Sequence, residues 1–507
     1  MKKLSILLIA MMAMLVLAGA GAFAATPGEK VLTIGVDQEA IGLDPHVVTA
    51  FSSMRRIDLL YSRLVRLDDN LVVVGDLAEK WDIPNNTTYV FHLRKGVKFH
   101  NGRELTSADV KYSLERVLDA KTASPGRSYI SSITSIETPD AYTVKVTLSA
   151  PLASFLDGLC TNNLSIVAKE VVEANGNLQK VTGGTGPFML SEWIPDNSMT
   201  LVKNPSYFEA GAPYLDKVIF RVIPEQASLL SGVKSGDLSM ATISDGATIR
   251  LAAKEPKVTV MSKPGLNVRI FSFNTTAKPF DDVRVRQAFA MTLNRAEILT
   301  ISEFGMGKPT GPVPVSATQW ALPLTKLPYA KPDTSKAKKL LAEAGYPKGF
   351  TFKITCASTY EGGLAVAQVV QSELKAIGVT AELEVVEWGV YIDKWVKRDF
   401  TTMVELRGGS GEPDRFLYRT FYSTGGVNNF LFKDAEVDKY LDLGRTQTAF
   451  ADRKASYDKL QSLLIEKAPA VFLYSPNENH VLGSKVSGFK QVGNGSLFYL
   501  TFAKIAP

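Results

Sequence analysis

Apolar and polar residues alternate along the segment 88–94, where Tyr89, Phe91 and Leu93 share one side of the chain. A repeat of two residues is typical of a strand that is buried on one face and exposed on the other. We therefore expect a half-buried strand here, followed by a turn at Gly96.

The pattern changes to a helical repeat in the segment 107–118. Apolar residues recur there at helical intervals, at Val110, Leu114, Val117 and Leu118. Thr106 or Ser107 can supply the N-cap oxygen, and Asp109 stands in the first turn, where the helix dipole favours a carboxylate. The spacing predicts a capped helix that packs along one face.

Strand and helix patterns alternate along the rest of the chain, which predicts an α/β fold. Expected strands span 31–36, 142–148, 188–193, 379–386 and 470–474. Expected helices span the first part of 58–67, then 282–293, 335–344, 364–377 and 451–467. Asp281 or Asp282 is the expected cap of the second helix, and Thr334 or Ser335 of the third.

The N-terminus has the pattern of a secretory signal peptide. Lys2 and Lys3 precede an apolar run over 4–18, and small residues end at Ala24 in an A-x-A motif. We expect cleavage after Ala24, so that 1–24 is the signal peptide. The sequence has no Cys near this point for lipid attachment. The mature protein is therefore predicted to be free in the periplasm.

Composition narrows the class of partner. The chain has 507 residues and a formal net charge of +6, with no basic run of the kind that nucleic-acid binding needs. Its length suggests two to four folding units. The two cysteines, Cys160 and Cys356, are expected in different parts of the fold as separate buried thiols.

Motifs for catalysis or metal binding are missing from the sequence. Only four His are present, with no H-E-x-x-H and no C-x-x-C. The glycines at 408–411 lack the G-x-S-x-G spacing of a nucleophile elbow, and Gly305–Lys308 lacks the residues of a P-loop. We predict a protein that is not an enzyme and has no catalytic residue, cofactor or metal, and keep a periplasmic hydrolase as the competing class.

Several segments together resemble one protein family. They are the stretch 77–117, LDPH at 43–46, GTGPF at 184–188, FNTTAKPFDDVRVRQAFAMTLNR at 273–295 and AEAGYPKGF at 342–350. These resemble bacterial extracellular solute-binding proteins of family 5, the peptide, nickel and opine class. The chain is similar to dipeptide- and oligopeptide-binding proteins, which are periplasmic substrate-binding components of ABC transporters.

The resemblance implies a two-lobed periplasmic-binding-protein fold of type II, cluster C-like, with an extra subdomain inserted in lobe one. Lobe one would comprise 31–67, 186–270 and 481–507. The inserted subdomain would be 68–185, and lobe two 271–480. The ligand would be enclosed between the lobes.

The segment 387–422 is the expected source of specificity. In peptide receptors of this family, an Asp in the comparable loop pairs with the α-amino group of the peptide. Here that position falls on Gly409 or Ser410, while Glu412 matches the Asp of a following Asp-Pro pair. Removing one partner of a buried charge pair costs about 3–5 kcal/mol, so a ligand with a free α-amine is disfavoured. Arg407 and Arg415 bracket the loop and suit a carboxylate.

The family resemblance also implies further residues near the ligand. From lobe two these are Trp388 and Asn274, and from lobe one Phe51, Ser52, Thr185 and Gly186. The aromatic residues Trp388, Tyr391 and Trp395 form one helical stripe, a pattern that also fits packing in a core.

We therefore expect a receptor that captures a small polar ligand and delivers it to the permease of an ABC importer. A short or modified peptide is the leading ligand class. An opine, an oligosaccharide or a metal chelate are the alternatives. No nucleic acid is expected as a partner, and the receptor is expected to be a monomer.

Overall fold

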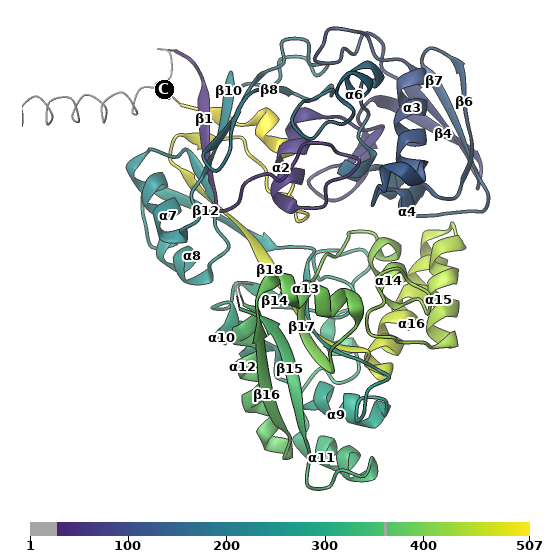
Figure 1. Cartoon of the computed structure of the whole chain (residues 1–507), viewed down its shortest axis with the longest axis vertical. Helices are drawn as coiled ribbons and strands as arrows, with labels where there is room; N and C mark the ends of the chain where they lie inside the picture. The colour runs from purple at the N-terminus through teal and green to yellow at the C-terminus, as the bar shows by residue number, and fades with distance from the viewer. Residues whose placement is uncertain (1–27, 359–361, 507) are drawn as a thin grey trace, which may run out of the picture.

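The computed structural model describes residues 28–358 and 362–506. The predicted signal peptide, 1–24, lies outside these residues. The described chain forms two bodies, one above the other in Figure 1, and the strand β18 (Ala470–Gly483) runs between them. No helix within 28–358 or 362–506 is both long and apolar enough to cross a membrane.

A single twelve-stranded sheet extends through both bodies. Its main path runs β16-β15-β17-β13-β18-β11-β1-β10-β9-β8, with β12 and β14 also paired to β18. In the upper body the strands are β1 (Val31–Val36), β8 (Phe188–Ile194), β9 (Ser198–Lys203), β10 (Lys217–Val222), β11 (Met240–Thr242) and β12 (Val258–Pro264). In the lower body they are β13 (Val268–Phe273), β14 (Gly307–Pro309), β15 (Thr351–Ala357), β16 (Thr380–Val386) and β17 (Thr402–Arg407).

The strand β18 is much longer than the expected strand over 470–474, because its two halves belong to different bodies. The half at 470–474 pairs with β13, and the half at 477–483 pairs with β12. The chain crosses between bodies after Pro264, since Leu266 and Val268 already pack in the core of the lower body. Both crossings therefore fall a few residues before the expected boundaries at 270 and 480.

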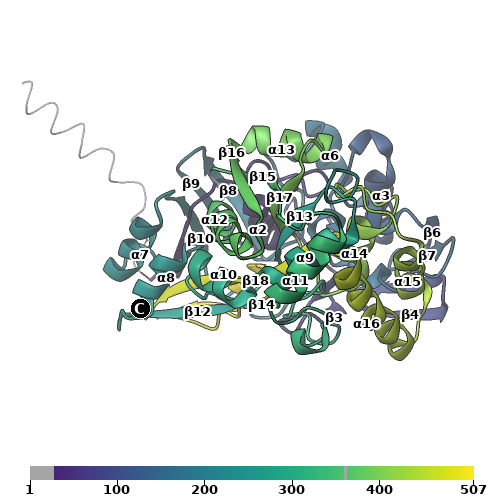
Figure 2. The same cartoon turned by 90° about the horizontal axis from the view of Figure 1, so that it is seen from below.

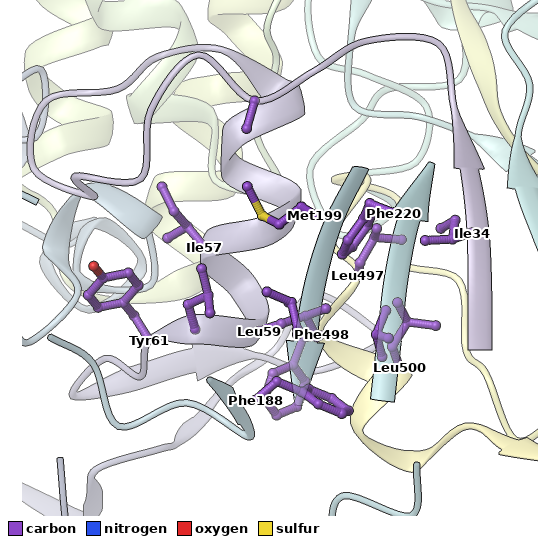
Figure 3. Close-up of a cluster of buried hydrophobic side chains, with 14 of the residues drawn as sticks. Ile34, Ile57, Leu59, Tyr61, Phe188, Met199, Phe220, Leu497, Phe498 and Leu500 are labelled. Carbon is purple, nitrogen blue, oxygen red and sulfur yellow. The ribbon is translucent and has the colours of Figure 1, made fainter. Parts of the chain in front are cut away.

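The core of the upper body lies between its sheet and α2 (Phe51–Leu60), as Figure 3 shows. Ile34, Phe188, Met199 and Phe220 from the strands meet Ile57, Leu59 and Tyr61 from α2 and the residue after it, together with Leu497, Phe498 and Leu500. The remaining elements here are α7 (Gln226–Ser235), α8 (Gly246–Ala252), β19 (Val486–Ser487), η5 (Phe498–Phe502) and β20 (Lys504–Ile505). The expected helix in 58–67 thus begins earlier, at Phe51, and ends at Leu60.

A second sheet in the upper body has the order β4-β5-β7-β6. The strands of this part are β2 (Val65–Leu67), β3 (Val73–Gly75), β4 (Ala78–Asn85), β5 (Thr88–Leu93), β6 (Ile133–Asp140) and β7 (Thr143–Leu148). Its helices are α3 (Ser107–Leu118), η1 (Ala120–Thr122), α4 (Arg127–Ile130), α5 (Phe155–Leu159), η2 (Asn162–Leu164) and α6 (Lys169–Asn175). Phe91 of β5 and Val110 and Leu114 of α3 share one core, as their periodicity predicts.

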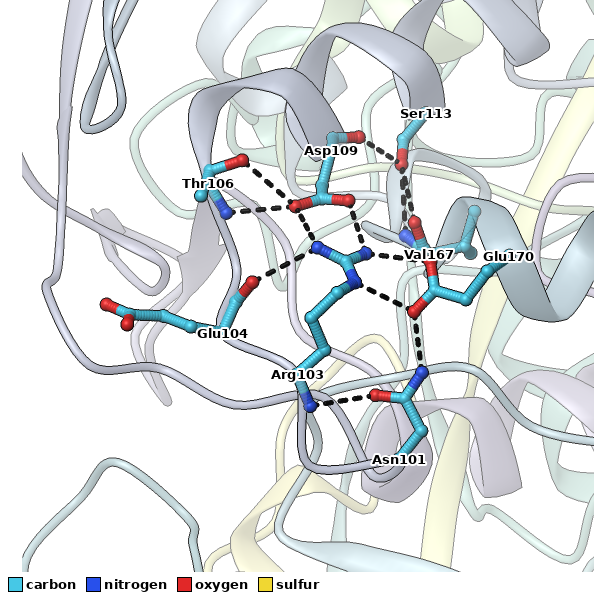
Figure 4. A network of polar contacts seen from close by, with 8 residues as sticks. All are labelled: Asn101, Arg103, Glu104, Thr106, Asp109, Ser113, Val167 and Glu170. Carbon is cyan, nitrogen blue, oxygen red and sulfur yellow. Dashed lines mark hydrogen bonds and ion pairs between the residues drawn. The ribbon is translucent and has the colours of Figure 1, made fainter.

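The start of α3 is held by a polar network, shown in Figure 4. The Asp109 carboxylate accepts a hydrogen bond from the backbone N–H of Thr106 at 2.9 Å, so Thr106 is the N-cap residue. Arg103 lies between two acids, 2.6 Å from Asp109 and 2.8 Å from Glu170 of α6. The network therefore joins the capped helix to its neighbour.

The lower body surrounds an aromatic core that contains Phe273, Phe280, Phe289 and Phe352. Its helices are α9 (Val283–Thr292), α10 (Arg295–Ser302), η3 (Leu324–Lys326), α11 (Thr334–Glu343), α12 (Gly363–Leu374), η4 (Lys375–Ile377), α13 (Trp388–Lys397), α14 (Pro413–Phe421), α15 (Ala435–Thr446) and α16 (Phe450–Lys467). Asp282 caps α9 as one of the two expected residues. For α11 the expected caps are wrong, because the carboxylate of Asp333 accepts the N–H of Lys336.

The two cysteines are separate and buried, which confirms the expectation of two free thiols. Cys160 packs in the core around α3, and Cys356 packs in the core of the lower body.

Candidate functional site

A cavity of about 400 Å³ lies where the two bodies face each other. Its upper wall is formed by α2, the segment 160–163 and the segment 493–496. Its lower wall is formed by the loop 408–411 after β17 and by α14. The lining comprises Thr49, Phe51, Met54, Arg55, Asp58, Leu67, Pro125, Tyr129, Cys160, Thr161, Asn162, Asn163, Leu266, Asn267, Gly408, Gly409, Ser410, Gly411, Arg415, Arg419, Glu478, Gly493, Asn494, Gly495 and Ser496.

One face of α2 lines the upper wall. Phe51, Met54, Arg55 and Asp58 reach the cavity, at the spacing that places residues on one side of a helix. The charged residues on this face form ion pairs with residues outside the lower wall. Arg55 pairs with Glu478 of β18 at 3.0 Å.

Asp58 is held by an ion pair and a backbone hydrogen bond. Its carboxylate lies 3.3 Å from the Arg63 guanidinium and accepts the backbone N–H of Leu497 at 3.2 Å. Neither carboxylate of the cavity, Asp58 or Glu478, is therefore free for an ammonium group of a ligand.

The loop 408–411 packs closely against the chain where it crosses between the bodies. A Cβ atom built at Gly409 would lie 1.9 Å from the carbonyl oxygen of Leu266, so this position accepts only glycine without a backbone shift. Ser410 is buried, and its hydroxyl accepts the N–H of Glu412 at 3.1 Å. The loop thus presents backbone and small side chains where the family resemblance leads one to expect an Asp.

The helix α14 forms the charged part of the lower wall. Its N-cap is Glu412, whose buried carboxylate pairs with Arg453 at 2.5 Å. Arg415 and Arg419 are one helical turn apart, and both line the cavity. Arg415 pairs across to Asp157 of the upper body at 2.7 Å, whereas Arg419 donates to the hydroxyl of Tyr129 at 3.1 Å.

Tyr129 shows the electrostatic effect of these two arginines. Burial alone would raise the pKa of its hydroxyl. The positive charges of Arg415 and Arg419 outweigh burial and bring the pKa of Tyr129 below its usual value. The cavity is therefore electropositive at this end.

Comparison with known proteins decides the family. A model of the bacterial extracellular solute-binding proteins, family 5 (middle), matches residues 72–429. The chain belongs to family 5 of the bacterial extracellular solute-binding proteins. The dipeptide-binding protein of Pseudomonas aeruginosa is 29% identical over 492 residues, which cover 89% of this chain and 91% of that protein.

Two solved structures of similar proteins match the fold of this family 5 member almost end to end. The Helicobacter pylori protein DppA, in complex with the peptide STSA, is 29% identical with a TM-score of 0.82, covering 94% of this chain and 98% of that chain. The protein AgaA of A. tumefaciens R10, in complex with agropinic acid, is 29% identical with a TM-score of 0.80, covering 94% of this chain and 99% of that chain. The chain therefore has the α/β, two-lobed type II fold of periplasmic binding proteins.

Four of the residues expected near the ligand line the cavity of this family member. They are Phe51, Gly409, Ser410 and Arg415. The structure brings them together from α2, the loop and α14. Arg407 and Glu412, which flank the loop, do not line the cavity.

Arg407 does not line the cavity. Its guanidinium is buried, pairs with Glu405 at 2.8 Å, and lies between the rings of Trp395 and Phe430, 5.0 Å from each centroid. It also donates to Asn429. Because β17 alternates its side chains between two faces, Arg407 points into the lower body, and its observed contacts are structural.

Glu412 and Trp388 also lie away from the cavity. Glu412 is held by Arg453 as described above, in its role as the cap of α14. Trp388 begins α13, is 43% exposed, and stacks on Tyr391 with 5.5 Å between ring centroids. Tyr391 and Trp395 of the same stripe donate to Val404 and Glu405, so the stripe packs against β17.

The other four expected residues are buried in the framework. Ser52 lies on the inner side of α2, and Thr185 and Gly186 pack on the end of that helix. A Cβ atom at Gly186 would lie 2.4 Å from the carbonyl carbon of Leu60, which explains the glycine. Asn274 donates to the carbonyl of Phe400 at 3.2 Å.

Sequence reasoning missed the residues that give the cavity its charge. Arg419 stands four residues after Arg415, and this spacing on a helix was a usable signal. Tyr129 and Asp157 come from the inserted part of the chain, and no local pattern links them to α14. Among the described residues, no group of three or more His, Cys, Asp or Glu side chains is arranged to hold a metal.

Proposed function

We propose that this chain is the ligand-capturing receptor of an ABC importer and holds a short or modified peptide between its two lobes. The observation that supports this most is the cavity at the strand crossings, whose walls come from both bodies. A ligand that contacts both walls only when the lobes are closed stabilises the closed state by its differential affinity. Capture then requires no covalent step.

The proposal includes the remaining features of such a receptor. The chain is exported, cleaved after Ala24 and left without a lipid, so that it acts in the periplasm as a monomer and docks on permease subunits. Lobe one consists of 31–67, about 186–265 and the chain after 477, with 68–185 inserted, and lobe two is the rest. The family is one of solute-binding proteins, so we propose that the chain has no enzymatic activity.

The cavity argues for a ligand whose amine is modified or differently placed. Similar proteins were solved with the peptide STSA and with agropinic acid. In this chain the Asp expected in the loop is replaced by Gly409 or Ser410, and Gly409 has no room for a side chain. The carboxylates of Asp58 and Glu478 are already paired with arginines. An opine, an oligosaccharide or a metal chelate are the alternative ligands of the same receptor.

Calorimetric titration of the mature protein with di- and tripeptides, free and N-acetylated, tests the proposal. We expect saturable binding with one site per chain, a smaller radius of gyration by X-ray scattering on binding, and peptides recovered intact. Catalytic turnover of the peptides would point to the competing hydrolase class. Binding of an opine or an oligosaccharide but of no peptide would contradict the proposed ligand class.

A further inference from the structure

A second, smaller pocket of about 150 Å³ opens beside the cavity, between the inserted part of the upper body and the helices α14 and α15. We call it the side pocket. On the upper side it is bounded by residues of the segments 128–132 and 150–154, and on the lower side by Asp414, Arg415, Arg419, Arg445 and Thr446. Figures 1 and 2 both show α14 and α15 next to this edge of the upper body. Tyr129, Arg415 and Arg419 line both hollows, so the two meet there.

The side pocket holds more positive than negative charge. Arg445 pairs with Asp414 at 3.0 Å, and Asp414 also accepts the hydroxyl of Ser154 at 2.6 Å. Arg415 is matched by Asp157. These two pairs neutralise Asp414 and Asp157.

Arg419 has no carboxylate partner among the described residues, and its guanidinium donates to the hydroxyl of Tyr129. Among the residues that bound the side pocket, two further donors are buried without a partner, Nε of Arg415 and the hydroxyl of Ser132. A buried donor without an acceptor is destabilising, so an acceptor bound at this place would be favoured.

We propose that the side pocket is a subsite for an anionic group of the ligand, a carboxylate or a phosphate, and that Arg419 is its main charged contact. The ligand then extends from the cavity past Tyr129 into the side pocket. Guanidinium groups bind both kinds of oxyanion with charge-assisted hydrogen bonds. This subsite rests on the proposed receptor function, because that function supplies the part of the ligand that lies in the cavity.

The test uses two probes of the same shape and different charge, succinate and its neutral diamide, with inorganic phosphate as a third. Their apparent dissociation constants are measured by thermal-shift titration of the mature protein at constant ionic strength. We expect succinate or phosphate to bind and the diamide not to bind. The oxyanion that binds more tightly identifies the kind of group that the subsite accepts.

Arg419→Gln breaks no ion pair, so the variant is expected to fold. It should weaken binding of the favoured anion at least about tenfold, the usual effect of losing a charge-assisted hydrogen bond. Ser132→Ala should weaken it about threefold, as expected for a neutral donor. The matched control is Arg250→Gln, a change at an exposed arginine of α8, and it should bind like the wild type.

Trialanine and trialanine amide separate this subsite from the proposed function. Preference for the acid in the wild type, lost in Arg419→Gln, supports both. Equal binding of acid and amide leaves the receptor function in place and overturns the subsite. Anion binding that depends on Arg419 without any peptide binding supports the subsite and contradicts the peptide ligand. Anion binding that is the same in Arg419→Gln overturns the subsite.

Discussion

The two walls of the cavity differ in the partners of their charged side chains. On the α2 wall, Arg55 and Asp58 are paired with Glu478 and Arg63, which belong to β18 and to the chain just after α2. On the α14 wall, Arg415 is paired across the lobes and Arg419 has only a tyrosine hydroxyl. The α2 wall is therefore already neutral, whereas the α14 wall has charge available for lobe closure and for the ligand.

Arg407 ends the strand before the loop 408–411 and is buried inside the lower body, and its loss should have the largest effect. Arg407→Ala leaves the Glu405 carboxylate buried without its cation, which costs about 3–5 kcal/mol of unfolding free energy. Chemical denaturation measures this loss. Arg250→Ala, at an exposed arginine, should change stability by less than about 0.5 kcal/mol. Unchanged stability together with lost ligand binding would instead make Arg407 a ligand contact, as the sequence suggested.

Acid should lower the stability of the protein through His46, a buried residue that precedes α2. Burial and, next, the charge of Arg116 lower the pKa of His46 from 6.5 to about 4. The unfolded chain therefore binds this proton more readily, and stability from His46 is present above pH 6.5 and is lost as pH falls toward 4, by about 3 kcal/mol. His46→Gln should have a shallower fall between these pH values in denaturation experiments. Parallel curves for the two proteins would refute this assignment.

The pair between Arg415 and Asp157 should favour the closed state. Asp157→Asn removes a largely buried charge pair between the lobes, and we expect affinity for trialanine to fall about tenfold with little change in thermal stability, because the separated lobes leave both groups in water. X-ray scattering of the ligand-free variant should show a larger radius of gyration. Glu170→Gln breaks an exposed pair within the upper body and serves as the control. Equal affinities in all three proteins would show that the pair has no part in closure.

The smallest effect is expected on the α2 wall. Arg55→Gln removes a pair with Glu478 that is partly open to water, so its contribution is less than about 1 kcal/mol. Affinity for trialanine should change by no more than about threefold. A loss of affinity as large as that of Arg419→Gln would mean that the charges of the α2 wall contribute to ligand binding as much as those of the α14 wall.

Local patterns predicted the elements well, because their causes lie within a few residues. The alternation of Tyr89, Phe91 and Leu93 correctly predicted β5. Thr106 and Asp109 correctly predicted the capped start of α3. The length of β18 was not predictable in the same way. Its second half is stabilised by pairing with β12, which is distant in the sequence.

The candidate site was harder to predict for the same reason. Phe51, Gly409, Ser410 and Arg415 were found through the family resemblance, but Arg407 pointed the other way because a strand alternates its faces. Asp157 and Tyr129 meet α14 only through the packing of the two lobes. The spacing of residues along the sequence could not predict that contact.

Native mass spectrometry of the mature protein, purified without refolding, shows whether the chain carries an acidic ligand that depends on Arg419. We expect a bound small molecule that is released on denaturation, fragments as a peptide or modified peptide, and contains a carboxylate or phosphate. The same preparation of Arg419→Gln should retain much less of it. A released ligand without any acidic group, retained equally by both proteins, would contradict the anionic subsite at Arg419.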